Sequence, residues 1–135
     1  MIDKINHPAH YDGIHIEVIE LTEMYSFTIG NVIKYLCRAG KKEGATEHED
    51  LSKAAWYLRR AIDGGSSLTP VVCDKSAITA RATVELFTKA NVYIKRLFDA
   101  YPLSDDRYGT VTRASLNSTL QLVEARLKEI EREAN

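Results

Sequence analysis

The chain has 135 residues, of which 44% are hydrophobic and 27% are charged, and its formal net charge at pH 7 is -1. This composition is ordinary for one globular domain, and the charge argues against non-specific binding to duplex nucleic acid, which needs a basic excess. No apolar run approaches a membrane span, and the N-terminus lacks the hydrophobic region of a signal peptide. We therefore expect no membrane partner and a cytoplasmic location. Cys37 and Cys73 lie in no metal-ligand spacing, so we expect reduced thiols.

The first 13 residues form a segment rich in turn-forming and titratable residues. Two histidines and a tyrosine lie within five positions, next to a proline that stiffens the backbone. These residues are His7, Pro8, His10 and Tyr11. The composition predicts an ordered or semi-ordered N-terminal arm, for which a functional role and a structural role both remain open.

The segment 16–25, IEVIELTEMY, predicts a short helix with Ile16, Val18 and Ile19 on its inward side. Its carboxylates recur every three residues and share a broad face. They are Glu17, Glu20 and Glu23. Such a face is usually solvent-exposed, and the alternative is magnesium ligation, because Mg²⁺ prefers oxygen ligands.

The segment 30–42, GNVIKYLCRAGKK, predicts an amphipathic helix with Thr28 as its N-cap and Gly40 at its C-terminal end. Its polar residues recur at steps of three and four. They are Asn31, Lys34, Arg38 and Lys41. Arginine offers a planar fork for phosphate, lysine a point charge and asparagine a neutral donor and acceptor. This face is suited to a polyanionic small molecule, and a solvated charged surface is the alternative.

A third helix is predicted by the T-x-x-E capping box of Thr46 and Glu49, and Gly64-Gly65 should end it. Acidic residues fill its first turn, where the helix dipole favours them. They are Glu47, Glu49 and Asp50. We expect Trp56 and Tyr57 to serve helix packing, with base stacking as the alternative.

The second half begins with the linker-like segment 64–70 and then shows two heptad-like apolar seams. One seam predicts a long helix over 76–101, and the other predicts a helix over 115–133. Together they suggest an antiparallel helical hairpin that packs on the first half or on another copy of the chain. The whole sequence predicts an all-α fold of about five helices. We expect one compact domain, with a nucleotide-site region at 1–64, the linker and hairpin at 65–135, and a homo-oligomer formed through the C-terminal helices.

The commonest nucleotide and hydrolase motifs are absent from the sequence: it contains no GxxxxGK[ST], GxGxxG, GxSxG or HExxH. The remaining histidines, cations and carboxylates fit a nucleotide phosphate chain, with or without Mg²⁺. Phosphoryl transfer mainly requires positioning and charge stabilisation, which Lys and Arg can supply, while a histidine could orient or deprotonate the attacking group.

Four stretches, INHPAHYDG, IEVIE, GNVIKYLCRAGKK and EDLSKAAWYLRRAI, together resemble the small bacteriophage family typified by the T7-type phage nucleotide kinase. That family shares HPxHY, a short acidic helix, GNxxKYxxRAGKK and EDLxKAxxYL, and the match covers residues 5–62 in the same order. Cys37 stands where the family often has a large aromatic residue, which would alter packing beside the site.

The resemblance implies phosphoryl transfer from a nucleoside triphosphate to a deoxynucleoside monophosphate without a P-loop, in the cytoplasm of an infected bacterium. By position it implies three catalytic residues and six further nucleotide-binding residues. The catalytic residues would be His10, Lys34 and Arg38. The nucleotide-binding residues would be His7, Tyr11, Asn31, Tyr35, Lys41 and Lys42.

Two other functions remain open. The pattern Glu17-x-x-Glu20 followed by Glu47-x-x-Asp50 is similar to the ExxE…ExxD arrangement of MazG-type nucleoside triphosphate pyrophosphohydrolases, which bind magnesium between helices. The third possibility is a phage nucleotide-binding protein that sequesters its ligand without changing it. This protein would use the same basic face and histidines.

Overall fold

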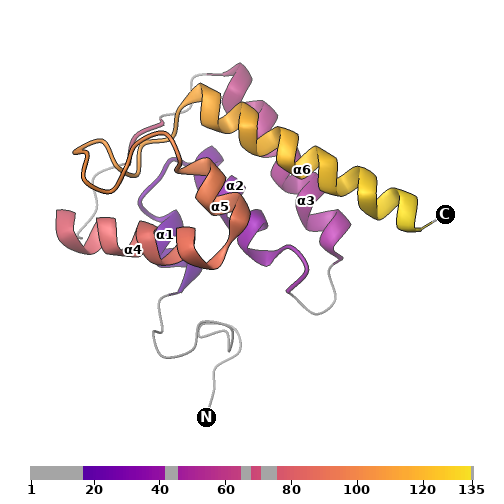
Figure 1. Ribbon diagram of the computed structural model, residues 1–135, viewed down its shortest axis with the longest axis horizontal. Helices are drawn as coiled ribbons and strands as arrows, with labels where there is room; N and C mark the ends of the chain where they lie inside the picture. Colours follow the sequence, from indigo (N-terminus) through magenta and orange to yellow (C-terminus); the bar gives the residue numbers. More distant parts are fainter. Residues whose placement is uncertain (1–16, 42–45, 65–67, 71–75, 135) are drawn as a thin grey trace, which may run out of the picture.

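The computed structural model describes residues 17–41, 46–64, 68–70 and 76–134, and these residues form six helices and no strand (Figure 1). The helices are α1 (Val18–Thr22), α2 (Phe27–Arg38), α3 (Glu47–Asp63), α4 (Ala77–Ala90), α5 (Val92–Leu97) and α6 (Arg113–Glu133). The predicted all-α class is confirmed. The described residues contain one helix more than expected, because the predicted long helix is broken.

Helix α2 contacts α1, α3 and α5, and its inward side chains lie in the hydrophobic core. Ile29, Val32 and Ile33 are 0% exposed, as the amphipathic spacing predicts. Gly40 follows the helix with a φ of 76°, a left-handed conformation that glycine adopts readily. The predicted end of this helix is therefore confirmed.

The start of α2 and the inward side of α1 differ from the prediction. The side chain of Ser26, not of Thr28, caps α2, because its Oγ accepts a hydrogen bond from the amide of Ile29 at 3.4 Å. In α1 the fully buried residue is Leu21, whereas Ile19 is 58% exposed. Of the predicted inward residues, Val18 packs against the core, Ile19 does not, and Ile16 lies outside the described residues.

Helix α3 begins at the predicted cap, where Thr46 Oγ1 accepts a hydrogen bond from the amide of Glu49 at 3.0 Å. Its apolar stripe is buried against α2 and α6. Trp56, however, is 58% exposed, so most of this side chain does not serve the helix packing expected of it. Tyr57 is partly buried against the core.

Asn91 divides the helix predicted over 76–101 into α4 and α5. Its backbone is extended, and its Oδ1 accepts hydrogen bonds from the amides of Tyr93 at 2.9 Å and Ile94 at 3.1 Å. Its Nδ2 donates to the carbonyl of Leu36 in α2 at 3.1 Å. Asparagine side chains compete with helical backbone hydrogen bonds in this way. The heptad-like spacing therefore predicted one continuous helix where Asn91 starts a new one.

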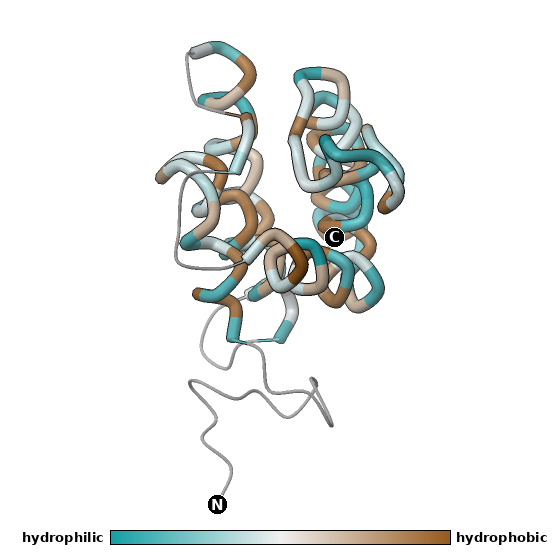
Figure 2. Tube along the Cα trace, turned by 90° about the vertical axis from the view of Figure 1, so that its left-hand side faces the viewer, coloured by the Kyte–Doolittle hydropathy of each residue, from teal (hydrophilic) through white to brown (hydrophobic). Residues whose placement is uncertain are grey.

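The predicted C-terminal hairpin is formed only in part. Helix α5, the last part of the helix predicted over 76–101, packs on α6, whereas α4 and α6 make no contact within the described residues. Helix α6 instead packs on α3 and α5, and its seam residues face this shared core. Three side-chain contacts of 2.9 Å tie α6 to α3: Glu47 to Arg126, His48 to Glu131 and Arg59 to Glu124. In Figure 2 hydrophobic and hydrophilic stretches alternate along the helices, as expected when each helix turns one face inward.

Tyr25 anchors the loop that precedes α6. Its hydroxyl donates a hydrogen bond of 2.7 Å to the carbonyl of Gly109, and burial raises the pKa of this phenol well above its ordinary value. Gly109 has a φ of 93°, which favours glycine. This contact joins the connection between α1 and α2 to a segment 84 residues later.

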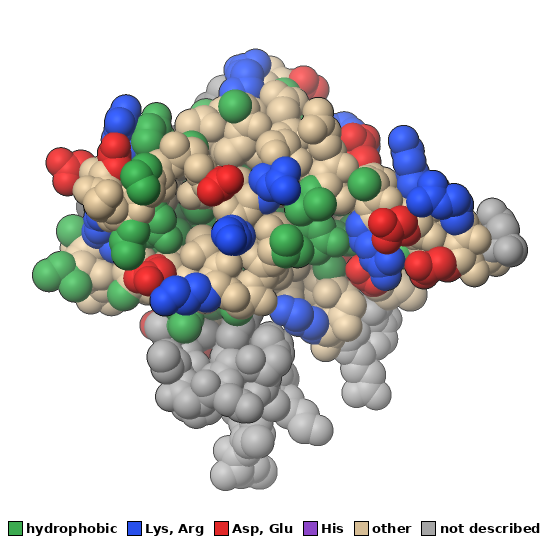
Figure 3. Space-filling model, in the orientation of Figure 1, with side chains coloured by type: hydrophobic (Ala, Val, Ile, Leu, Met, Phe, Trp, Pro, Cys, Tyr) green, Lys and Arg blue, Asp and Glu red, His purple; other side chains and the backbone are tan. Residues whose placement is uncertain are grey.

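Acidic and basic side chains are interspersed on the face shown in Figure 3, and hydrophobic side chains gather at its left edge, over α4. None of the helices in the described part of the chain is both long enough and apolar enough to cross a membrane.

Candidate polyanion-binding site

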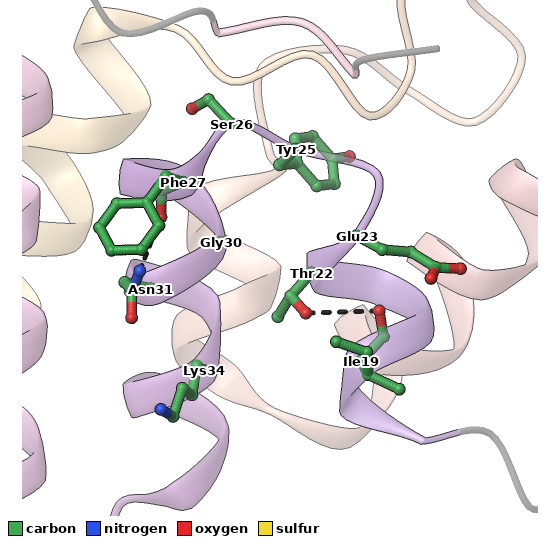
Figure 4. A pocket seen from close by; sticks show the side chains of 9 residues that line it. All are labelled: Ile19, Thr22, Glu23, Tyr25, Ser26, Phe27, Gly30, Asn31 and Lys34. Atoms are coloured by element: carbon green, nitrogen blue, oxygen red, sulfur yellow. Dashed lines mark hydrogen bonds between the residues drawn. The ribbon is translucent and has the colours of Figure 1, made fainter. Parts of the chain in front are cut away.

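The outer face of α2 carries polar and aromatic side chains at steps of four and three. Asn31 Nδ2 donates a hydrogen bond to the Phe27 carbonyl at 2.8 Å, which fixes the amide on this face, and Lys34 is exposed one turn later (Figure 4). Arg38 continues the row, and Lys41 is exposed in the turn after the helix. The structure therefore brings Asn31, Lys34 and Arg38 onto one side of the helix, as predicted.

The ring of Tyr35 is surrounded by three cationic groups. Lys34 Nζ lies 5.1 Å from the ring centroid, the guanidinium carbon of Arg38 lies 5.6 Å away, and Lys53 Nζ lies 5.4 Å away. Each is within the range of a cation–π attraction. Because the three groups repel one another, an anion placed among them would relieve that repulsion.

Lys53 is the site residue that sequence reasoning missed. It belongs to α3, three residues before Trp56, and its position beside Tyr35 results from the packing of α2 against α3. Neither Lys34 nor Lys53 forms an ion pair with a carboxylate of the described residues. Both ammonium groups are therefore available to an anionic ligand.

Tyr35 also belongs to an aromatic cluster that joins α2 and α3. Its ring stacks on Tyr57 with a centroid distance of 5.9 Å and an interplanar angle of 13°. Phe27 and Trp56 meet the ring of Tyr57 edge to face, at 6.3 Å and 4.9 Å. The two outer rings are largely exposed, Phe27 at 78% and Trp56 at 58%.

A shallow open groove of about 240 Å³ separates α1 from α2 beside Asn31 and Lys34 (Figure 4). A Cβ on Gly30 would lie 3.2 Å from the carbonyl oxygen of Thr22, so glycine at this position lets the two helices approach closely. Phe27 also lines the groove, which places an exposed ring at its edge.

The four carboxylates considered as magnesium ligands have other partners or lie apart. Glu20 accepts a hydrogen bond of 2.9 Å from the amide of Glu17 in the capping box of α1. Glu47 forms two hydrogen bonds of 2.9 Å with Arg126, which hold the pKa of this carboxyl below its ordinary value. Asp50 is 0% exposed. No group of three or more acidic, histidine or cysteine residues suited to a metal ion occurs in the described ranges, so the structure does not assemble these four residues as one site.

Four of the predicted nucleotide-site residues lie outside the residues that the structure describes. They are His7, His10, Tyr11 and Lys42. Their contribution to the site therefore remains a sequence prediction.

Taken together, the helices and the site define an all-α domain whose α2 and α3 present a basic and aromatic surface. Residues 5–59 match the family described as a protein of unknown function, DUF3310. The chain is also similar to the Gene 1.7 protein of Enterobacteria phage T3, with 44% identity over 62 residues. That alignment covers 39% of this chain and 38% of the phage protein, so the chain spans well under half the length of this relative. No solved structure matches the chain.

The family match includes the surface just described. Residues 5–59 contain α1, α2 and most of α3, and end before α4. The segment matched by the family therefore carries the basic and aromatic residues, whereas α4, α5 and α6 lie beyond it.

Proposed function

We propose that this protein binds a nucleotide through the basic face of α2 and α3 and transfers a phosphoryl group from a nucleoside triphosphate to a deoxynucleoside monophosphate. The observation that carries the proposal is the gathering of Lys34, Arg38 and Lys53 around the ring of Tyr35. A phosphate chain spreads negative charge over several oxygens and would contact all three cations at once, of which Lys34 and Lys53 have no carboxylate partner among the described residues. The sequence resemblance to the phage nucleotide-kinase family supports the same chemistry.

In the proposed reaction an oxygen of the monophosphate forms a bond to the γ-phosphorus while the bond from that phosphorus to the bridging oxygen breaks. The products are two diphosphates. Arg38 would hold phosphate oxygens with its planar fork, and Lys34 would stabilise the charge that develops on the transferred group. Asn31 would hydrogen-bond the nucleotide beside them, and His10 would orient the attacking phosphate or take its proton.

The proposed steps assign no resident magnesium ion to this chain. Glu47 is paired with Arg126, and Asp50 is buried, so the described carboxylates do not fit a resident magnesium site. For the same reason no observation favours pyrophosphate release by a MazG-type reaction. The likeness to a phage protein supports a role in the cytoplasm of an infected bacterium.

Separation of products by ion exchange tests the proposal. The pure chain is incubated with a nucleoside triphosphate, alone and with each deoxynucleoside monophosphate, in magnesium and in EDTA. A diphosphate derived from the added monophosphate, formed only when both substrates are present, is the expected result. Formation of monophosphate and pyrophosphate from the triphosphate alone would contradict phosphoryl transfer and indicate pyrophosphohydrolase activity. Nucleotides that bind stoichiometrically and stay intact would indicate a sequestering protein.

A further inference from the structure

We infer that Phe27, Tyr57 and Trp56 form a base-stacking subsite, here called the aromatic platform, which holds the nucleobase while the cations hold the phosphates. The ligand class rests on the proposed function. The subsite itself rests on a separate observation, the exposure and arrangement of these rings.

The platform exposes aromatic surface that proteins usually bury. Phe27 is 78% exposed and Trp56 is 58% exposed, although each contacts the same ring, that of Tyr57. The residues come from α2 and α3, so the packing of two helices brings the rings together. Contiguous exposed aromatic rings are a common feature of binding surfaces, and a base offers the flat apolar face that such rings attract.

The platform continues directly into the cationic cluster. Tyr57, at its centre, stacks on Tyr35, and the ring of Tyr35 carries the three cations at 5.1 to 5.6 Å. One end of this surface is therefore aromatic and the other is positively charged. A nucleotide has the matching polarity, with an aromatic base at one end and an anionic phosphate at the other.

Binding of the base by stacking predicts how strongly the subsite distinguishes one base from another. Stacking uses the face of a base, which all bases possess, so discrimination among bases should be modest. A larger purine ring covers more of the platform than a pyrimidine. We therefore expect dGMP to bind more tightly than dTMP by a few-fold, while deoxyribose 5-phosphate, which lacks a base, binds through the cations alone.

Trp56 gives this inference a direct optical readout, because it is the only tryptophan of the chain. Titration of the full chain with dGMP should quench its fluorescence in a saturable way. Deoxyribose 5-phosphate should displace dGMP in competition yet cause little quenching by itself. A saturable dGMP complex that leaves Trp56 fluorescence unchanged would overturn the stacking assignment.

Affinities of variants, measured by calorimetry, separate stacking from general stability. Trp56→Leu should weaken dGMP binding about tenfold and leave deoxyribose 5-phosphate binding unchanged, whereas Trp56→Phe should retain most of the dGMP affinity. Phe27→Leu should act like Trp56→Leu. Leu103→Ala is the matched control, because Leu103 is also exposed, at 43%, but lies in the loop between α5 and α6.

The outcomes distinguish the subsite from the proposed function. If both Trp56→Leu and Phe27→Leu bind dGMP with wild-type affinity and still transfer the phosphoryl group, the stacking subsite is rejected and the proposed kinase function is retained. Equal loss of dGMP and deoxyribose 5-phosphate binding would assign these residues to folding rather than stacking. A change of mass in Trp56→Leu by light scattering, with unchanged dGMP affinity, would make the surface a protein interface instead.

Discussion

Arg38 Nε lies 3.8 Å from Oδ1 of Asp50, a carboxylate that is 0% exposed. At this separation the two groups attract each other without sharing a hydrogen bond. Neither oxygen of Asp50 has a hydrogen-bond partner in the described part of the structure. A buried carboxylate needs a compensating cation, so this pair links the stability of the domain to the residue that we expect to bind phosphate.

Removing one member of this pair should destabilise the fold. We expect Arg38→Ala to lower the free energy of unfolding by about 2–3 kcal/mol, because Asp50 then stays buried without its nearby cation. Asp50→Asn introduced into Arg38→Ala should recover part of the loss, since a neutral amide needs no counter-charge. Urea unfolding of both single variants and the double variant measures the coupling, and simple additivity would show that the two groups act independently.

The lysines around Tyr35 should affect ligand binding and not stability. Lys34→Ala and Lys53→Ala should each weaken binding of a nucleoside triphosphate by roughly five- to tenfold, because each removes one positive charge from the phosphate position. The free energy of unfolding should change by less than about 0.5 kcal/mol. Lys95→Ala, at an exposed lysine of α5, is the control for net charge, and an equal loss of affinity in that variant would reject a localised site.

Asn91 should be important for the stability of the second half. Asn91→Ala removes the cap of α5 and the hydrogen bond to the Leu36 carbonyl, so we expect a loss of about 1–3 kcal/mol in unfolding free energy. Asn117→Ala is a suitable comparison, because Asn117 is exposed and bonds only to the Arg113 carbonyl one turn back. Chemical denaturation of both variants measures the difference, and similar small losses would show that the cap contributes little.

The contact between Glu47 and Arg126 should make stability depend on pH. The hydrogen bonds from Arg126 lower the pKa of Glu47 from its ordinary value of 4.5. The stabilisation is therefore complete above that value and is lost as pH falls through the lower pKa of the folded state. Glu47→Gln should be less stable than the wild type at pH 7, and the difference should shrink as the pH falls below 4.5 and through the lower pKa of the folded state. A constant difference across this range, measured by urea unfolding, would contradict the assignment.

Association between copies of the chain remains a prediction, but the apolar seams that suggested it are not available to form the contact. The apolar seams that suggested it face the core of a single chain, with Phe87 and Leu116 both 0% exposed. Exposed apolar side chains elsewhere, such as Ile78 at 82% and Val92 at 62%, would have to form the contact. Light scattering at micromolar concentration should give a mass above that of one chain, and Ile78→Asp should reduce it. A monomeric mass would contradict the prediction of a homo-oligomer.

Local sequence patterns predicted the existence of the first three helices and the polar face of α2. The apolar spacing of α2 placed Ile29, Val32 and Ile33 in the core and left Asn31, Lys34 and Arg38 on the opposite side. Thr46 and Gly40 marked a helix start and a helix end correctly. These features depend on neighbours within one or two turns, so the sequence alone carries them.

Tertiary structure decided the features that depend on which helix meets which. The heptad-like spacing indicated apolar faces correctly, but it could not show that α6 packs on α3 rather than on α4. The side chain of Asn91 ends one helix and starts another by reaching Leu36, a residue 55 positions away. In the same way, Lys53 joins the cations around Tyr35, and Phe27 joins the rings of Tyr57 and Trp56, only because α2 lies against α3. Periodicity defines the face of one helix, whereas a site shared by two helices is fixed by their packing.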